Sequence, residues 1–285
     1  MSSWNPWHGC AKISPGCRNC YVFRRDESYQ KDASKVHKTA DFDLPIKKNR
    51  SGEYKLSPDG DFCYTCFTSD FFVPQADGWR EAAYSFMRER SDLLFYIITK
   101  RPERFYKVLP TDWGDGYDNV YISCTVENNE FAHKRLPVYL DLPIKHKSIV
   151  VEPMLEEVDL TPFFEKYKRQ IECVTVGGES GDLARLCEYD WVLSMRESCV
   201  KYNVAFHYHQ TGARLFVGDH GADIHFDMLY DDIGQHNARE RDRHYGSAAR
   251  IARQAHHYHH HENDSLLGAL AHQPWHYTAL SALSA

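Results

Sequence analysis

Three cysteines near the start of the chain have a spacing that indicates chemistry. Cys10, Cys17 and Cys20 form a Cys-x6-Cys-x2-Cys pattern in a segment that has no helical periodicity and is rich in glycine and proline. A single free cysteine is usually a small buried hydrophobic residue. Three thiols from one short, turn-rich span suit zinc or an iron–sulfur cluster, because thiolates are ligands of both. The pattern therefore predicts a metal centre.

The fourth ligand decides which metal these cysteines would hold. A structural zinc site needs four protein ligands, and the nearest candidates are His8 and a second pair, Cys63 and Cys66. The pair lies in an expected strand, where residues three apart face opposite sides, so only one of the two could easily reach the first three. Three cysteines without an obvious fourth ligand suit a 4Fe-4S cluster with one iron open to a small molecule. We therefore expect a 4Fe-4S cluster, with zinc as the alternative metal.

The elements that must position the cysteines alternate between strands and helices. Short runs rich in β-branched and aromatic residues are separated by segments with helical spacing, which indicates parallel βαβ units. We therefore expect an α/β fold, a partial parallel (β/α) barrel of about six to seven strands with the cysteines at its mouth. The expected strands are 62–68, 93–99, 120–126, 148–152, 172–176 and 204–209. The expected helices are 78–90, 102–108, 130–140 and 190–202.

Each expected strand ends in polar or reactive residues. The carboxyl ends of barrel strands converge on one face, where active sites lie. Strands commonly run into polar loops, but six such ends in succession favour a shared site. The candidate cofactor-binding residues are Ser69, Asp70, Lys100, Glu127, Asn128, Gly177, Gly178 and Glu179. The candidate catalytic residues are Glu152 and His209.

Several of these strand ends admit both a functional and a structural interpretation. Glu152 follows a run that is apolar enough to be buried, so its carboxylate needs a partner. Lys100 and Arg101 could bind a carboxylate or phosphate, or could simply precede a helix. Asn128 could contact a ribose hydroxyl or cap a helix. His209 could donate a proton or contact substrate, or it could be structural.

The motifs that contain these residues occur together in a known family. The sequence resembles a phage and bacterial family of uncharacterised proteins that have an N-terminal three-cysteine motif and are related to radical S-adenosylmethionine (SAM) enzymes. The resemblance covers residues 4–215 and lies in WNPWHGCAKISPGCRNCY (4–21), FTSDFF (67–72), ITKRPERF (98–105), VENNEFAHKRLP (126–137), VEPMLEEVDL (151–160), VGGESGDLAR (176–185) and HQTGARL (209–215). It implies that Cys10, Cys17 and Cys20 are cluster ligands in a radical-SAM-like barrel of the TIM type.

The resemblance also implies a function. Radical SAM enzymes use a reduced 4Fe-4S cluster to cleave SAM, and the resulting radical abstracts hydrogen from a substrate. An electron donor is then required, and the substrate could be a nucleic acid or nucleotide. Two features depart from the usual pattern: the first cysteine gap is six residues instead of three, and Gly177-Gly178-Glu179 follows a late strand instead of the second. By position, Ser69 and Asp70 are better candidates for the SAM ammonium contact.

Two other classes of function remain open. The protein could be a non-catalytic module that holds zinc or an iron–sulfur cluster as a phage-type accessory protein. It could also be a metal-dependent enzyme that processes nucleic acid without SAM, using the carboxylates of Asp70, Glu127 and Glu152. The polar strand ends disfavour the first alternative.

Composition limits the setting in which the protein works. The chain has 285 residues, a net charge of −6 and nine cysteines. The negative charge argues against a purely electrostatic nucleic-acid binder. The chain has no apolar run of about 18 residues and no signal-peptide pattern, so we expect a cytoplasmic protein without a membrane partner. We expect a barrel domain over residues 1–215 and a partly helical or disordered extension over 216–285, whose histidines at 256–261 lie outside the site.

Overall fold

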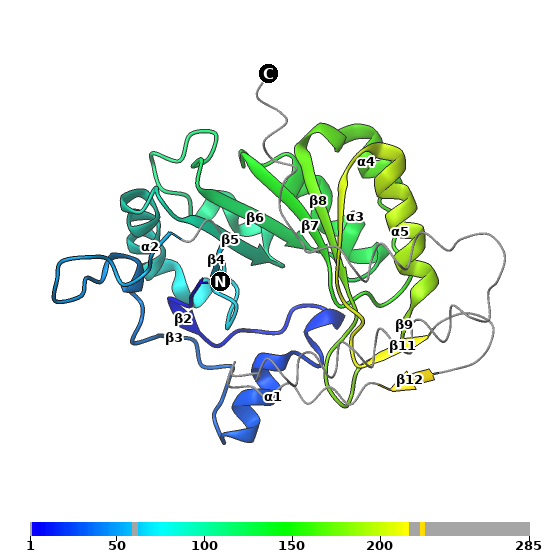
Figure 1. The fold of residues 1–285 in the computed structure, drawn as a ribbon, viewed down its shortest axis with the longest axis horizontal. Coiled ribbons are helices and arrows are strands. Elements are labelled where there is room, and N and C mark those ends of the chain that lie inside the picture. Colours follow the sequence, from blue (N-terminus) through cyan, green and yellow to red (C-terminus); the bar gives the residue numbers. More distant parts are fainter. Residues whose placement is uncertain (1, 59–61, 217–222, 226–285) are drawn as a thin grey trace. The chain divides into compact units, whose positions relative to one another are not determined.

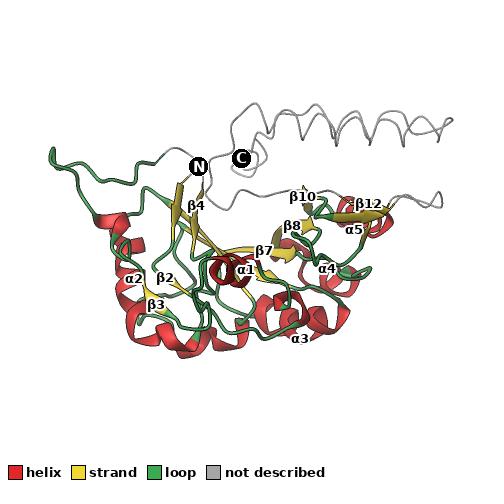
Figure 2. Cartoon of the chain, turned by 90° about the horizontal axis from the view of Figure 1, so that it is seen from below, coloured by secondary structure: helices red, strands yellow, loops and turns green. Residues whose placement is uncertain are grey.

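A parallel sheet that curls into half a barrel forms the framework of the protein. The computed structural model describes residues 2–58, 62–216 and 223–225. Every neighbouring pair of strands in this seven-stranded sheet is parallel, and Figure 2 shows its curvature. In spatial order the strands are β1 (Ser2–Trp4), β4 (Phe62–Thr65), β5 (Leu94–Thr99), β6 (Val120–Thr125), β7 (His146–Val151), β8 (Ile171–Gly177) and β10 (Ala205–Gln210). The predicted α/β partial barrel is confirmed.

Helices cover the outer, convex side of the curled sheet (Figure 2). They are α2 (Asp77–Glu89), α3 (Asn129–Leu140), α4 (Thr161–Tyr167) and α5 (Tyr189–Tyr202). Between β5 and β6 the chain forms a 3-10 helix, η4 (Pro102–Lys107), where helical spacing predicted a helix over 102–108. A further helix, α1 (Tyr21–Ser28), follows the three cysteines directly.

Burial alternates along β4 and β5, where one side of the sheet is covered by helices. In β5, Phe95 and Ile97 are fully buried, whereas Tyr96 is partly exposed. Tyr96 pairs in register with Tyr121 of β6, which is also partly exposed. A closed parallel barrel would bury both sides of each strand. The half-open sheet instead leaves an inner face with aromatic side chains, among them Phe62, whose ring centroid lies 4.9 Å from that of Tyr121.

Short elements complete the described part of the chain. Strands β2 (Trp7–His8) and β3 (His37–Lys38) pair antiparallel. Strands β9 (Cys187–Glu188), β11 (Arg214–Phe216) and β12 (Asp223–His225) form a small separate sheet. The remaining 3-10 helices are η1 (Pro15–Cys17), η2 (Leu44–Ile46), η3 (Pro74–Ala76) and η5 (Lys168–Gln170).

Two further sequence predictions concern membrane spans and the C-terminal extension. None of the helices in the described part has both the length and the apolar character of a membrane span. The predicted extension over 216–285 and its histidines at 256–261 lie almost wholly outside the described residues, so the boundary near residue 215 stays a prediction.

Candidate functional site

The segment that contains the three cysteines, residues 9–24, lies against the carboxyl ends of the sheet strands. We call it the cysteine segment. At its start Gly9 N–H donates to the Thr68 carbonyl at 3.1 Å, and the Ser69 hydroxyl donates to the Gly9 carbonyl at 2.5 Å. Gly9 has a φ of +88°, and a Cβ there would lie 2.7 Å from the Lys35 carbonyl oxygen. Only glycine fits this turn. The two hydrogen bonds to the loop after β4 fix the chain directly before Cys10.

A buried ion pair after β4 and β5 holds the backbone beside Cys10. Arg101 donates to the Asp70 carboxylate at 2.9 Å and to the Ala11 carbonyl at 2.6 Å. The same guanidinium lies 3.7 Å from the Cys10 sulfur. The other donors to the Asp70 carboxylate are Thr99 Oγ1 (2.8 Å), Lys100 N (2.9 Å) and Phe72 N (2.9 Å). With four donors, Asp70 serves mainly to position Arg101.

The environment of Cys10 keeps its thiol protonated when no metal is bound. Burial, reinforced by the negative charge of Asp70, raises the pKa of the Cys10 thiol to about 11, although Arg101 acts in the opposite direction. Cys17 is close enough to raise this pKa further. Buried Cys66, which has a φ of +66° just after β4, also lies within electrostatic range of Cys10. Cys66, from the second cysteine pair, therefore lies near Cys10.

Glu127, at the carboxyl end of β6, lies beneath the middle of the cysteine segment. Its side chain is fully buried and accepts a hydrogen bond from Arg135 at 2.7 Å. The Ser14 hydroxyl donates to the same carboxylate, and the Lys100 ammonium lies 3.8 Å away. A Cβ at Gly16 would collide with the Glu127 side chain. Glu127 therefore anchors the turn that contains Cys17.

The loop after β8 binds the end of the cysteine segment. Glu179 accepts two side-chain hydrogen bonds from Arg185, at 2.8 and 2.5 Å, and one from Asn19 at 3.0 Å. Arg24 donates to the Ser180 hydroxyl at 3.1 Å. Burial acts to raise the pKa of Glu179, but the hydrogen bonds from Arg185 and Asn19 outweigh it, so this pKa lies below its usual range. Glu179 is therefore charged and holds the turn between Cys17 and Cys20.

The two predicted catalytic residues meet at the carboxyl ends of β7 and β10, the strands on either side of β8. Glu152, just after β7, accepts a hydrogen bond from His209 Nδ1 at 2.9 Å, and Gln210 donates to its second oxygen. A Cβ at Gly177 would lie 2.6 Å from the Glu152 carboxyl carbon, and a Cβ at Gly178 would collide with the Thr211 carbonyl. The two glycines are thus required for packing within the chain itself.

The remaining predicted residues have mixed surroundings. Asn128 caps α3 by accepting a hydrogen bond from Phe131 N at 3.0 Å. Lys100 is a predicted cofactor-binding residue. Its side chain is 20% exposed, and its ammonium lies close to the Glu127 carboxylate. Four residues that hold the site were not predicted from the sequence: Ser14, Asn19, Arg24 and Arg135. Only Arg135 carried a usable signal, because it follows Glu127 by eight residues on the next helix and can return to it.

Free thiols of suitable number are present in the cysteine segment. All nine cysteines lie in the described residues and none forms a disulfide. Cys10, Cys17 and Cys20 are partly exposed. Across the described residues, however, no three histidine, cysteine or carboxylate side chains are arranged as a ready metal-binding group. His8 lies close by but its ring is 2.6 Å from the Asp26 carboxylate. The donor types fit a thiolate-bound centre, and ligation would require the thiols to move together.

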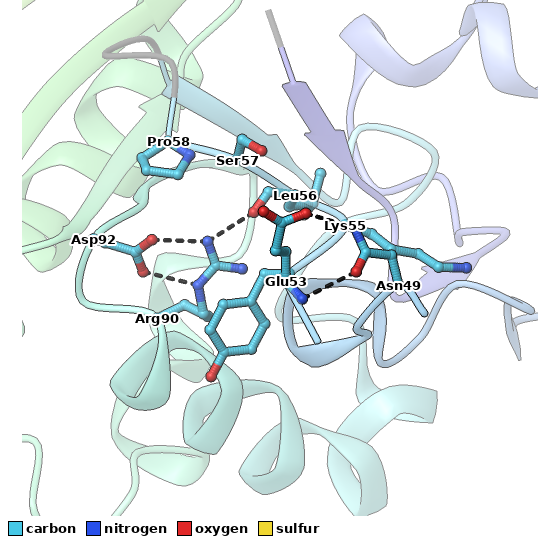
Figure 3. Close-up of a pocket in the computed structure, with 9 residues that line it drawn as sticks. Asn49, Glu53, Lys55, Leu56, Ser57, Pro58, Arg90 and Asp92 are labelled. Atoms are coloured by element: carbon cyan, nitrogen blue, oxygen red, sulfur yellow. Dashed lines mark hydrogen bonds and ion pairs between the residues drawn. The ribbon is translucent and has the colours of Figure 1, made fainter. Parts of the chain in front are cut away.

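A separate cleft of about 540 Å³ lies at the other end of the sheet, before β5 begins. Arg90 lines it and is saturated by the protein: it donates to Asp92 at 2.8 Å and to the Leu56 carbonyl at 2.8 Å (Figure 3). Tyr54 stacks on this guanidinium, with the Arg90 Cζ 4.1 Å from the ring centroid. These contacts hold the 49–58 loop to the barrel, and we assign no chemistry to the cleft.

Together the fold and site define an α/β half-barrel protein whose cysteine segment is bound across the carboxyl ends of its sheet (Figure 1). A family model described as "Protein of unknown function (DUF5131)" matches residues 1–260, so the chain belongs to this family. Comparison with curated proteins and with solved structures gave no match. The predicted membership of an uncharacterised family is confirmed, whereas its phage association and its relation to radical SAM enzymes stay predictions.

Proposed function

We propose that Cys10, Cys17 and Cys20 bind a 4Fe-4S cluster and that the protein is a radical-SAM-like enzyme. The observation that carries this proposal is the way the strand ends hold the cysteine segment. Polar groups that follow four different strands, β4, β5, β6 and β8, bind this one segment. A framework that fixes a three-cysteine loop at the mouth of a barrel suits a cofactor that must face a ligand there.

The Arg101 guanidinium would partly offset the charge of a thiolate-bound centre, although burial and the Asp70 carboxylate oppose this effect at Cys10. Arg101 lies 3.7 Å from the Cys10 sulfur, and Lys100 follows the same strand. The segment is held mainly through its backbone and its Ser14 and Asn19 side chains, and only weakly through the thiols. When bound, a 4Fe-4S cluster with one open iron would supply the electron that cleaves SAM.

The SAM-binding residues are a narrower part of the proposal. Four of the predicted contacts already hydrogen-bond to other residues of the chain: Ser69, Asp70, Glu127 and Glu179. They would have to contact SAM while keeping these partners. The other predicted contacts are the backbone at Gly177 and Gly178 and the side chain of Asn128. Among these residues Lys100 is the cation best placed for an anionic ligand group. Glu152 and His209 are the proposed catalytic residues.

Reconstitution without oxygen tests the cluster. The protein is purified anaerobically, supplied with iron and sulfide, reduced, and assayed for deoxyadenosine release from SAM. Binding of about four irons per chain with broad visible absorption supports the proposal. The Cys17→Ser variant should lose the cluster, whereas Cys199→Ser, at a buried position in α5, should retain it. Full iron content in the Cys17 variant would show that the ligands are wrongly assigned.

The second candidate function is a non-catalytic module that holds zinc or an iron–sulfur cluster. It is favoured by the saturated carboxylates of Asp70, Glu127 and Glu179, which act as structural anchors. Tight binding of zinc without visible absorption, and without SAM cleavage, would favour it. The carboxylates of Asp70, Glu127 and Glu152 have separate partners, so the SAM-independent metal enzyme has less support.

A nucleic-acid or nucleotide substrate, an electron donor and a cytoplasmic location complete the leading proposal of a radical-SAM-like enzyme.

A further inference from the structure

A β-bulge at the end of β10 brings two consecutive side chains to one carboxylate. Successive residues of a regular strand face opposite sides of the sheet. The pairing of β10 with β8 passes from Tyr208–Val176 directly to Gln210–Gly177, so His209 is an extra residue. As a result both His209 and Gln210 donate to Glu152. Bulges of this kind re-aim side chains beside active sites.

The Glu152 carboxylate is fixed from three sides. His209 donates to one oxygen and Gln210 to the other. The bare backbone of Gly177 packs against the carboxyl group so closely that a Cβ would lie 2.6 Å from the carboxyl carbon. The Glu152 side chain is only 20% exposed. The two donors occupy both carboxylate oxygens, and the close packing of Gly177 keeps the group from turning away.

This arrangement selects one tautomer of the His209 ring. An ionised carboxylate can only accept hydrogen bonds, so Nδ1 must carry a proton. In the neutral ring the lone pair then lies on Nε2. The His209 side chain is 53% exposed, which leaves Nε2 open toward a ligand. We propose that Glu152, His209 and Gln210 form an acid–base site in which His209 Nε2 exchanges a proton with a hydroxyl or amine group of a bound ligand.

The proton transfer is balanced within this group of residues. A ligand O–H or N–H gives its proton to Nε2, and the bonding electron pair stays on the ligand atom. The Glu152 carboxylate offsets the positive charge that forms on the ring. In the reverse direction the imidazolium returns the proton to a basic ligand atom. The acid–base role of His209 rests on the proposed function only for the position of the ligand. The contacts among Glu152, His209 and Gln210 do not involve the cysteines.

The charged neighbours of His209 act in a definite order. The hydrogen bond to Glu152 raises the pKa of His209, burial lowers it by less, and the charge of Glu152 raises it further. His207, whose ring centroid lies 6.1 Å away on the same strand, has its own pKa lowered by burial and then by His209. His209 thus becomes neutral at a higher pH than an ordinary exposed histidine.

Site-resolved ethoxyformylation of the purified protein tests the proposal. Diethyl pyrocarbonate modifies neutral imidazole at an open nitrogen, and fragment-ion mass spectrometry separates His207 from His209. We expect ethoxyformylation of His209 to become fast at a higher pH in the wild type than in Glu152→Gln. At pH 6 the variant should react several-fold faster, because a larger fraction of its His209 ring is neutral without the Glu152 carboxylate. Glu172→Gln, which alters the 2.8 Å pair with His146, is the matched control.

Two outcomes would overturn the acid–base site. One is an identical pH profile for His209 in the wild type and in Glu152→Gln. The other is a wild-type ring protonated on Nε2 in ¹⁵N-histidine spectra, with the signal assigned by His209→Asn. The spectra need no Glu152 variant, so they decide the tautomer even if that variant does not fold. Iron content is measured on the same samples, so failure of the cluster and failure of the acid–base site are distinguishable.

Discussion

The replacement Glu127→Gln probes how strongly the sheet holds the cysteine segment. The wild-type carboxylate is fully buried, and Arg135, whose side chain is 4% exposed, donates to it at 2.7 Å. Glutamine keeps the shape but removes the charge, so the Arg135 guanidinium becomes a buried charge without a counter-ion. Breaking a buried pair in this way costs about 3–5 kcal/mol. Because the amide oxygen can still accept a hydrogen bond, we expect the lower end, about 3 kcal/mol.

This loss of stability is large enough to measure directly. For a domain of 150–250 residues, 1 kcal/mol lowers Tm by roughly 2–4 °C, so the variant should melt about 6–12 °C below the wild type. The exposed residue Glu130, three positions along the chain, gives the matched control Glu130→Gln, which should change stability by less than about 0.5 kcal/mol. Alkylation of Cys17, followed by mass spectrometry, should be faster in Glu127→Gln because Ser14 loses its charged acceptor.

Two results would refute this reasoning. A loss below about 1 kcal/mol would mean that water or another group compensates Arg135, contrary to its burial. A large loss with unchanged alkylation of Cys17 would mean that Glu127 stabilises the barrel but does not position the cysteine segment. In the second case the central observation behind the proposed function would fail.

Two further predictions test the turns and ion pairs beside the site. Gly178→Ala should destabilise the protein, because the new Cβ would collide with the Thr211 carbonyl. Gly78→Ala in α2 meets no atom within 4 Å and should stabilise the protein by about 0.5–1 kcal/mol. Denaturant unfolding measures both free energies, and equal effects would contradict the packing argument. The pKa of Glu179 is lower in the folded state, so its contribution to stability is present above the unfolded-state pKa and is lost as pH falls through the folded-state pKa. The drop in Tm below about pH 4.3 should therefore be shallower in Glu179→Gln than in the wild type, and parallel curves would show that Arg185 does not hold this carboxylate.

Much of the fold could be predicted because its signals are local. All six expected strands occur within a few residues of their predicted bounds, since each is a run of β-branched and aromatic residues with a turn on either side. Strand β1 escaped prediction because three residues, Ser2–Trp4, carry no periodicity; its pairing with β4 creates it. Helix α1 escaped because Tyr21–Ser28 is mostly polar and charged, with only Val22 and Asp26 buried.

The site could be predicted only in outline, because its contacts join distant parts of the chain. The rule that parallel strands end on one face correctly placed Asp70, Glu127 and Glu179 near the cysteines. It could not show that their hydrogen bonds go to the cysteine segment, nor that Asp70 and Glu127 pair with Arg101 and Arg135. The bulge at His209 was likewise invisible, because an extra residue in a strand depends on the partner strand.

The partners of the three buried carboxylates indicate how the cysteine segment could rearrange to hold a metal. Each carboxylate takes its positive charge from the barrel: Arg101 for Asp70, Arg135 for Glu127, and Arg185 for Glu179. To these carboxylates the segment adds only the neutral donors Ser14 and Asn19, and a hydrogen bond to a charged group contributes about 1.5–3 kcal/mol. Losing one such bond costs less than leaving a buried charge unpaired, about 3–5 kcal/mol. The segment can therefore shift to bring its thiols together while the barrel keeps its ion pairs, and metal binding, which releases protons from the thiols, would be coupled to that shift.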